Sequence, residues 1–412
     1  MKKVIVIGGG ASGLMAAGIA GKNADVLVLE KNDRVGRKLA ITGKGRCNVT
    51  NSADISEFIE NTPGNGRFLY SAFYSFTNDD TINFFNKLGV KTKVERGGRV
   101  FPVSDSAKDI VNALSRVLRE NNVKIRYNVV AKEVITENGK VAGVKLSSGE
   151  IINCDKVIIA TGGKSYPATG STGDGYEIAK KLGHKIIPPK PSLVGLVSYT
   201  EWIPKLQGLS LKNVGFSLFD SKNKEIYSDF GEMLFTHFGV SGPIVLSGSR
   251  VLHKYMDENR CVNGIKARID LKPALDNKKL DLRVQRDFQK YINKELKNSL
   301  YDLLPEKLVP VIISLTKIDE SKKVNVITAE ERKRIVELLK GLEFEINELR
   351  PIDEAIITAG GVCTDEINPS TMESKIVNGL YFCGEVIDVD AYTGGFNLQI
   401  AFSTAFLAGN NI

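Results

Sequence analysis

The chain has 412 residues, of which 42% are hydrophobic and 25% are charged. Both fractions are close to those of globular proteins and exclude collagen-like, disordered and disulfide-scaffold classes. The length is greater than one hydrophobic core usually fills, so we expect two or three domains. The net charge of +8 leaves nucleic acid or an anionic surface open as a partner until the distribution of charge is known.

The cysteines and the apolar runs indicate the compartment. The five cysteines, among them Cys47 and Cys261, form no C-x-x-C pair, which argues against a disulfide framework or a zinc site and favours a reducing compartment. The apolar run at residues 4–7 is shorter than the roughly 7 to 15 residues of a signal-peptide core. No window reaches the ~18 apolar residues of a membrane span. We therefore expect a cytoplasmic protein with no membrane interaction.

The first thirty residues predict a strand, a glycine turn, a helix and a second strand, at residues 4–7, 8–13, 14–24 and 26–29. The turn reads Gly8-x-Gly10-x-x-Gly13. Its first glycine permits the turn, its second lets a pyrophosphate approach the backbone, and its third lets helix and strand pack closely. Glu30 ends the second strand, where an acid accepts hydrogen bonds from a ribose. This unit predicts a site for the ADP part of a dinucleotide.

The remaining segments alternate between helical and strand-like patterns. Helical spacing occurs at residues 79–88, 106–121, 176–182, 275–300 and 325–341. Strand-like runs occur at 129–135, 141–146, 150–154 and 156–160, and as several short strands within 193–270. Residues 33–52 are rich in Gly, Arg, Lys and Asn without periodicity, which predicts an ordered loop that needs a ligand or a partner surface.

Later clusters decide between NAD and FAD. Residues 158–163 predict a strand that ends in small residues, so the chain can pass close to a bound cofactor. Another strand stops at Gly384, an acid follows, and a double glycine precedes a helix that begins near Asn397. That helix N-terminus can present backbone donors to the electron-rich edge of a flavin. A C-terminal strand that returns to the cofactor favours FAD, and an NAD-only dehydrogenase is the alternative.

Three segments carry a resemblance to a known family: GRKLAITGKGRCNVTN (36–51), LFTHFGVSGPIVL (234–246), and TAGGV with GLYFCGEVIDVDAYTGGFNLQIAF (358–362 and 379–402). They are similar to the BaiN-like, aminoacetone-oxidase-like family of bacterial NAD(P)/FAD-dependent oxidoreductases, flavoproteins of the glutathione reductase type. The resemblance covers essentially the whole chain. Two departures lie at Lys44 and at Ala391, after Asp390, where glycine is common in that family.

The resemblance implies an α/β fold with a Rossmann-like FAD-binding domain, a β-rich inserted domain and a helical cap. The predicted boundaries are 1–190 for the N-terminal part of the FAD-binding domain, 191–270 for the β-rich domain, 271–325 for the cap, 326–353 for the return to the β-rich domain, and 354–412 for the C-terminal part of the FAD-binding domain.

The resemblance also implies which residues line the cofactor, namely Ser12, Glu30, Arg37, Lys38, Val130, Thr161, Asp388, Asn397 and Leu398. The glycine-rich motifs and their neighbours complete the predicted cofactor-binding set with Gly8, Gly10, Ala11, Gly13, Lys31, Gly36, Leu39, Gly45, Arg46, Cys47, Asn48, Ala160, Gly162, Gly384, Glu385, Gly394 and Gly395.

Catalytic residues are harder to assign, because a flavin carries the redox step itself. Arg46 could hold a substrate carboxylate or offset charge on a reduced flavin, although a structural role in its loop is the simpler interpretation. Tyr392 could act as a proton donor. Cys47 has no resolving cysteine within two or three residues, which argues against a redox role. His237 is most simply a core or interdomain histidine. No histidine and carboxylate cluster suggests a metal site.

We therefore expect an FAD-dependent oxidoreductase that transfers hydride to or from a small organic substrate. The family resemblance implies either amine oxidation or reduction of a carbon–carbon double bond, and both remain open. NAD(P)H is a possible transient donor, although the chain has no second G-x-G-x-x-G unit to bind it. The oligomeric state is not predicted.

A flavin-containing RNA-binding or RNA-modifying protein is a further alternative. Residues 264–300 contain ten basic and five acidic side chains. Their interspersed signs, and the small number of aromatic residues among them, favour a solvated helix face over a nucleic-acid surface. The alternative predicts salt-sensitive RNA binding.

Overall fold

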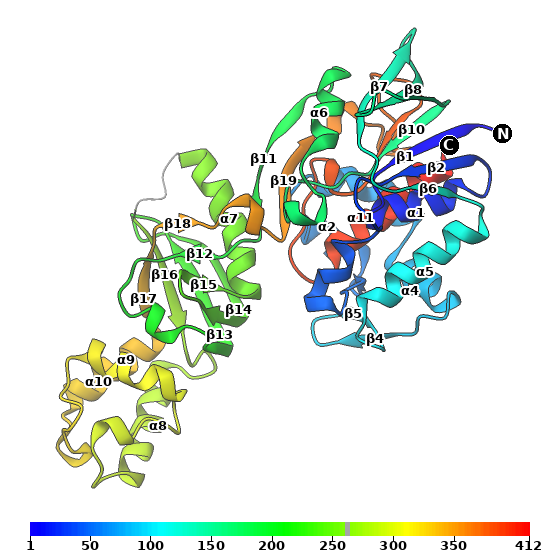
Figure 1. The fold of residues 1–412 in the computed structure, drawn as a ribbon. Helices are drawn as coiled ribbons and strands as arrows, with labels where there is room; N and C mark the ends of the chain where they lie inside the picture. Colours follow the sequence, from blue (N-terminus) through cyan, green and yellow to red (C-terminus); the bar gives the residue numbers. More distant parts are fainter. Residues whose placement is uncertain (260–263) are drawn as a thin grey trace. The chain divides into compact units, whose positions relative to one another are not determined.

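The computed structural model describes residues 1–259 and 264–412 and divides them into two compact units (Figure 1). Unit 1 consists of Met1–Ser192 and Ile352–Ile412, and unit 2 consists of Leu193–Pro351. Cys261 lies outside the described residues. The two ends of the chain therefore fold together, and the middle forms a second unit. The finer five-segment division remains a prediction.

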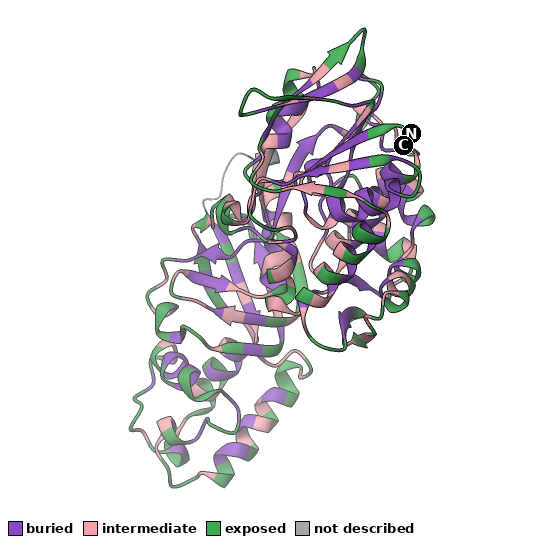
Figure 2. Cartoon of the chain, turned by 45° about the vertical axis from the view of Figure 1, so that its right-hand side comes forward, coloured by how far each residue is buried: buried purple, intermediate pink, exposed green. Residues whose placement is uncertain are grey.

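Unit 1 is built on a five-stranded parallel sheet in the order β20-β10-β1-β2-β6. Its strands are β1 (Lys3–Ile7), β2 (Asp25–Leu29), β6 (Lys124–Arg126), β10 (Lys156–Ile159) and β20 (Leu380–Phe382). The strands are rich in Val, Ile and Leu and are mostly buried (Figure 2), as expected for a parallel sheet. Since β20 pairs with β10, the C-terminal segment completes the sheet that the N-terminus begins.

Two helices that are apolar nearly all round lie in the core of unit 1. They are α1 (Ala11–Ala20) and α11 (Phe396–Asn410). They pack closely, because an added Cβ at Gly409 would lie 2.7 Å from the carbonyl oxygen of Ala16. Among the helices in the described ranges, none combines the length and the apolar character needed to cross a membrane.

Smaller elements surround this core and follow the predicted pattern. The helices are α4 (Asn78–Lys87), α5 (Ala107–Glu120) and α6 (Asp174–Lys181). The predicted meander is confirmed as an antiparallel sheet of β7 (Ala131–Glu137), β8 (Lys140–Leu146) and β9 (Ile151–Asn153). Two further strands, β11 (Ile186–Ser192) and β19 (Ile357–Val362), pair antiparallel and bring the two segments of unit 1 together.

Unit 2 contains a seven-stranded sheet in the order β17-β16-β13-β14-β15-β12-β18. Its strands are β12 (Leu196–Val197), β13 (Ser210–Phe219), β14 (Glu225–Phe235), β15 (Gly239–Ser241), β16 (Ile265–Asp270), β17 (Leu342–Ile346) and β18 (Glu348–Leu349). Its helices are α7 (Pro243–Asn259), α8 (Asn277–Lys290), α9 (Val309–Thr316) and α10 (Ala329–Lys340).

The prediction that residues 193–270 form mostly short strands includes no helix and is wrong over α7. Pro243 starts this helix directly after Gly242, whose φ of 100° turns the chain, and proline is favoured in a first helical turn. The pattern is hard to recognise because the helix contains β-branched residues and Ser247, Gly248 and Ser249, all of which have low helix propensity.

Candidate cofactor-binding site

The turn between β1 and α1 is held by close backbone contacts. An added Cβ at Gly13 would lie 1.8 Å from the carbonyl oxygen of Gly8, and one at Gly8 would lie 2.6 Å from that of Ala160. Gly8 also has a φ of 105°, which favours glycine. The first and third glycines of the motif are therefore required by packing alone.

Gly10, the second glycine of the motif, differs from Gly8 and Gly13. Its φ of −83° is open to any residue, and an added Cβ would meet no atom of the described residues within 4 Å. Gly10 is the N-cap of α1, and the first turn continues with Ala11, Ser12 and Gly13. With no capping side chain at Gly10, the first-turn amides are left to bind an anion. The open space and these amides suit the diphosphate of a dinucleotide.

Glu30 lies at the C-terminal end of β2 beside this turn. Its Oε2 accepts a hydrogen bond from the amide of Gly9 at 2.8 Å, and its Oε1 accepts from the amide and the Nδ2 of Asn32 at 2.8 and 2.7 Å. Arg37 donates to Oδ1 of Asn32 at 2.8 Å. A carboxylate has about four acceptor positions, so Glu30 retains capacity for a ribose hydroxyl.

Two other predicted residues lie near Glu30. Lys31 donates to Oδ2 of Asp174, at the start of α6, at 2.7 Å. The backbone of residues 129–130 lies alongside, because the amide of Val129 donates to the carbonyl of Glu30 at 3.0 Å. The side chain of Val130 is exposed, so it is free to cover a bound adenosine.

The loop of residues 36–48 has an unusual backbone. Gly36, Gly43 and Gly45 all have positive φ, and so do two residues with side chains, Lys44 at 58° and Cys47 at 61°. The positive φ at Lys44 explains why glycine is suited to this position. Leu39 anchors the loop in the core, since its side chain is buried. Left-handed residues of this kind cluster at ligand sites, where the surrounding structure holds them.

The Arg46 guanidinium is engaged by groups of its own unit. Its Nη2 lies 2.5 Å from Oε1 of Glu95 and 2.6 Å from Oδ1 of Asp105, and its Cζ lies 4.2 Å from the ring centroid of Phe101. The hydrogen bonds to Glu95 and Asp105 raise the pKa of Arg46. These contacts favour the structural role for Arg46 over a catalytic one.

Cys47 is fully buried, and burial raises the pKa of its thiol to about 12. The thiolate is the reactive form of cysteine, and this environment suppresses it. The burial therefore supports the interpretation that Cys47 has no redox role.

Asn48 ends the loop beside the N-terminus of α11. Its Oδ1 is buried and has no hydrogen-bond partner among the residues that the structure describes. An added Cβ at Gly395, the N-cap of α11 with φ 105°, would lie 3.0 Å from this oxygen. An unpaired buried acceptor costs about 1–3 kcal/mol, so its retention points to a donor on a bound group. Gly394 and Leu398 flank the same helix start.

Four polar side chains join the strand ends to the loop, and we call them the Glu385 cluster: Lys38, Ser165, Thr358 and Glu385. Lys38 Nζ lies 2.8 Å from Oε2 of Glu385 and 2.6 Å from Oγ of Ser165. Oε1 of Glu385 accepts from Ser165 Oγ at 2.9 Å and from the Thr358 amide at 2.8 Å. Oγ1 of Thr358 in turn accepts from the amides of Lys164 and Ser165 at 2.8 and 3.1 Å.

The Glu385 cluster gives Glu385 a structural role within the protein and adds two residues to the candidate site. Glu385 holds protein segments together, with three protein donors on its two oxygens. Ser165 and Thr358 are fully buried, and the sequence analysis missed both. Only Thr358 could have been found from the sequence, because it is the first residue of the family-like TAGGV segment. The negative charge of Glu385 also adds to burial in raising the pKa of Tyr176 on α6.

Small residues bring the remaining strand ends close to α1. Ala160, Thr161 and Gly162 follow β10, and Gly162 has a φ of 71°. Gly384 follows β20, and an added Cβ there would lie 2.5 Å from Oγ of Ser12. The ends of β1, β10 and β20 therefore meet at the carboxyl edge of the sheet, where ligands bind in open α/β sheets.

The loop before α11 is fixed by Asn397 and Asp388. Oδ1 of Asn397 accepts from the amide of Ala391 at 2.9 Å, and its Nδ2 donates to the carbonyl of Ala391 at 2.7 Å. Oδ2 of Asp388 accepts from Nδ2 of Asn65 at 2.9 Å. The backbone amide of Tyr392 donates to the carbonyl of Asn61 at 2.9 Å. Asn397 thus shapes the loop that carries Tyr392.

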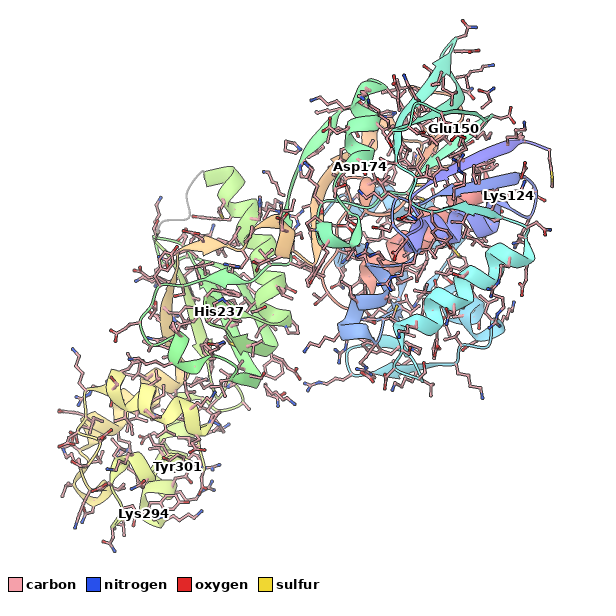
Figure 3. The ribbon with its side chains drawn as sticks, in the orientation of Figure 1. Lys124, Glu150, Asp174, His237, Lys294 and Tyr301 are labelled. Carbon is pink, nitrogen blue, oxygen red and sulfur yellow. The ribbon has the colours of Figure 1, made fainter. Side chains whose placement is uncertain are left out.

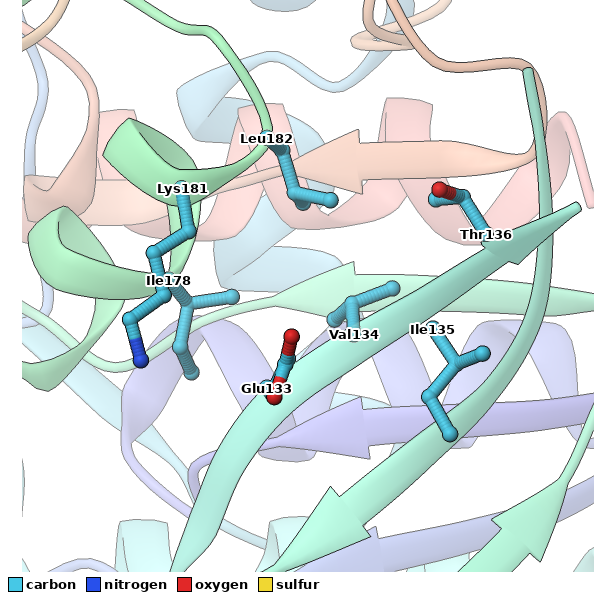
Figure 4. A pocket seen from close by; sticks show the side chains of 7 residues that line it. All are labelled: Glu133, Val134, Ile135, Thr136, Ile178, Lys181 and Leu182. Carbon is cyan, nitrogen blue, oxygen red and sulfur yellow. The ribbon is translucent and has the colours of Figure 1, made fainter.

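A cavity of about 240 Å³ lies away from these residues, between β7 and α6 (Figure 4). Glu133, Val134 and Thr136 line it from β7, and Ile178 and Lys181 line it from α6. None of the cavity's lining residues belongs to the predicted cofactor-binding set. We therefore base the candidate site on the strand ends and helix N-termini.

His237 lies in unit 2, on the turn between β14 and β15 (Figure 3). Its side chain is exposed and its ring packs edge-on against Phe238 at 5.1 Å. His237 is therefore not a core histidine, because the tight turn from Thr236 to Gly239, closed by a 2.8 Å hydrogen bond, presents it at the surface of unit 2. The alternative of an interdomain histidine stays a prediction.

Comparison with known proteins agrees with this architecture. The chain is 33% identical to a 3-dehydro-bile acid delta(4,6)-reductase of Clostridium scindens, over 99% of this chain and 98% of that protein. It is 32% identical to a ribosomal RNA dihydrouridine synthase of Escherichia coli, over 99% of this chain and 97% of that protein. A related protein of that name from Haemophilus influenzae is 34% identical, over 99% and 98%.

Solved structures share the fold at lower identity. A 3-ketosteroid-delta4-(5alpha)-dehydrogenase from Rhodococcus jostii has a TM-score of 0.55 at 13% identity, covering 100% of this chain and 96% of that one. A flavocytochrome c3 fumarate reductase has a TM-score of 0.52 at 16% identity, covering 100% and 78%. The predictions of a Rossmann-like FAD-binding fold and of an FAD-dependent oxidoreductase are confirmed. Residues 2–411 match the model of the HI0933-like protein Rossmann domain, and the chain belongs to that family.

Proposed function

We propose that the protein reduces a carbon–carbon double bond conjugated to a carbonyl group. The observation that carries this proposal is that the relatives matching 99% of this chain have names that describe the same kind of reaction. A delta(4,6)-reductase saturates ring double bonds, and dihydrouridine is uridine with two hydrogen atoms added. In a 3-oxo steroid and in uracil alike, such a double bond is polarised by a carbonyl. Neither name describes amine oxidation, the other reaction that the sequence left open.

The described residues suit FAD, which when bound would supply the hydride for this reaction. Gly10 and the first-turn amides of α1 would hold its diphosphate. Glu30 would accept from the adenosine ribose. The N-terminus of α11 would stabilise negative charge. The buried Oδ1 of Asn48 would accept from a polar N–H.

Reduction of a conjugated double bond also requires a proton. Tyr392 is our proposed donor, because its phenol is a suitable acid and Asn397 fixes its loop beside the start of α11. Arg46 is not proposed as a catalytic residue, because its guanidinium is held by Glu95 and Asp105. NAD(P)H is our proposed source of the electrons for this reduction.

Anaerobic flavin absorbance would test this proposal. We expect NADH or NADPH to bleach the visible flavin band of the holoprotein, and a 3-oxo-4,6-diene steroid to restore it. Bleaching by a panel of primary amines, with no reoxidation by the steroid, would replace the proposal with amine oxidation.

A second candidate is reduction of uridine within RNA. Two relatives that match over 99% of this chain are named ribosomal RNA dihydrouridine synthases. The same assay distinguishes this candidate, because an RNA containing uridine would then reoxidise the reduced flavin and the steroid would not.

A further inference from the structure

Helix α8 of unit 2 separates its charges by face. At 3.6 residues per turn, an arc of about 120° contains Lys278, Lys279, Leu282, Arg286, Gln289 and Lys290. All six side chains are exposed, and every charged one among them is basic. The opposite face consists of Leu280, Val284 and Phe288, which are buried in the core of unit 2. We call the exposed arc the basic face of α8.

The acidic residues of the helix are directed elsewhere and are already paired. Oδ1 of Asp281 lies 2.7 Å from Nε of Arg332, and this contact lowers the pKa of Asp281. Oδ2 of Asp287, whose side chain is largely buried, lies 2.8 Å from Nε of Arg283. Within the helix, the basic face itself therefore contains no acidic side chain. Acidic groups meet it only at its borders, where Asp276 lies 3.7 Å from Lys279, Asp287 lies 4.0 Å from Arg286 and Asp302 pairs with Lys290.

Aromatic side chains continue the basic face at its C-terminal end. The ammonium groups of Lys290 and Lys294 lie 4.9 and 4.8 Å from the ring centroid of Tyr291. Tyr291 is half-buried and Tyr301 is exposed, and Figure 3 labels Tyr301 with Lys294 on this helical part of unit 2. Bases stack on such rings, and phosphates pair with the neighbouring cations. These two tyrosines supply the aromatic side chains that a nucleic-acid surface needs.

An anionic membrane fits this face less well than a polyanion. A helix that lies in a lipid interface needs a broad apolar face, and the apolar face of α8 is used by the core. On the basic face the apolar contribution is Leu282. The pair between Lys290 and Asp302, at 2.5 Å, is exposed and therefore worth little, so phosphate groups can compete for Lys290.

We propose that the basic face of α8, with Tyr291 and Tyr301, binds the phosphate backbone of RNA. The choice of RNA as the polyanion rests on the second candidate function, but binding does not presuppose the double-bond chemistry. The basic side chains from Lys278 to Lys290 span roughly 18 Å of helix, enough to contact several phosphates of one strand.

Fluorescence anisotropy of a labelled ribosomal RNA hairpin tests the proposal on the FAD-loaded protein of 412 residues. We expect Lys278→Gln/Arg286→Gln to weaken binding by about tenfold or more. We also expect it to reduce the slope of log Kd against log salt by about 2, because each lost phosphate contact removes about one unit. Unchanged flavin absorbance and Tm would show that the variant is folded.

The matched control is Lys108→Gln/Lys124→Gln, two exposed lysines of unit 1 with the same loss of charge. The proposal requires that this control bind RNA as the unaltered protein does. Equal weakening of RNA binding in the α8 variant and in the unit 1 variant would mean that only net charge matters, and it would overturn the proposal. Weakened binding of the α8 variant to phosphatidylserine vesicles, with unaltered RNA binding, would assign the face to membranes instead. Flavin reoxidation by a steroid is measured in a separate assay, so a failure of the proposed reaction is distinguishable from a failure of RNA binding at α8.

Discussion

Lys38 and Glu385 are 347 positions apart in the chain, yet Nζ of Lys38 lies 2.8 Å from Oε2 of Glu385. Both side chains are largely shielded from solvent, so water screens this pair less than a surface pair. The contact joins the loop after β2 to the turn after β20. The candidate site therefore depends on both ends of the chain, and Ser165 and Thr358 extend the connection to β10 and β19.

Thr358→Val tests the Glu385 cluster without creating a cavity. Valine keeps the shape but removes the acceptor for the amides of Lys164 and Ser165, which costs about 1–3 kcal/mol. We expect the Kd for FAD, measured by fluorescence titration of the apoprotein, to rise about tenfold (~1.4 kcal/mol). Thr358→Ser retains the hydroxyl and serves as the control. Equal FAD affinity of the Val and Ser variants would contradict a positioning role.

The two glycines Gly10 and Gly13 give opposite expectations for the same change. Gly13→Ala places a methyl group against the carbonyl of Gly8, and such overpacking costs about 1–3 kcal/mol or more, so we expect the apoprotein to melt at lower temperature. In Gly10→Ala the added methyl group meets no atom of the described residues, so we expect an unchanged apoprotein Tm. The methyl group would occupy the space proposed for the diphosphate, so we expect FAD to bind at least about tenfold more weakly. Calorimetry and FAD titration of both variants check this, and normal FAD binding by Gly10→Ala would exclude a diphosphate there.

Asn48→Leu should separate stability from cofactor affinity. It removes a buried oxygen that has no partner among the described residues, and replacing such a group by an apolar one of similar shape is neutral or stabilising. We expect the free energy of unfolding of the apoprotein to stay equal or rise by up to about 1 kcal/mol, while FAD binds more weakly. Denaturant titration and FAD titration measure the two effects. A destabilised apoprotein with normal FAD affinity would show that Asn48 serves the fold alone.

His184 predicts a loss of stability on acidification. Burial lowers its pKa, although Glu366 beside Nδ1 opposes this effect; Nε2 lies 2.9 Å from Oγ of Ser374. Since the folded-state pKa lies below that of the unfolded chain, the unfolded state binds more protons as pH falls. The free energy of unfolding should therefore decrease below about pH 6.5, by at most about 1.4 kcal/mol per pH unit.

Denaturant titrations at a series of pH values compare the unaltered protein with His184→Gln, which cannot titrate. We expect the variant to lack this part of the pH dependence. The same slope in both proteins would assign the acid sensitivity to other groups.

Local patterns made the βαβ unit predictable, because strand, glycine turn and helix are determined by neighbouring residues. The predicted bounds of the helix, 14–24, are nevertheless wrong at both ends, since α1 begins at Ala11 inside the glycine motif and ends at Ala20. The partners of Arg46 were not predictable, because Glu95 and Asp105 lie 49 and 59 residues away in the sequence. Ser165 was missed for the same reason. The charge separation on α8 depends on Arg332, which only the tertiary fold brings to Asp281.

A single-turnover experiment tests the central claim most directly. The holoprotein is reduced anaerobically with one equivalent of NAD(P)H and mixed with either a 3-oxo-4,6-diene steroid or a uridine-containing RNA, and products are identified by mass spectrometry. The account predicts that one of these substrates gains two hydrogen atoms, in a quantity equal to the flavin reoxidised. Purified protein that contains no FAD, or reduced flavin that neither substrate reoxidises, would contradict it.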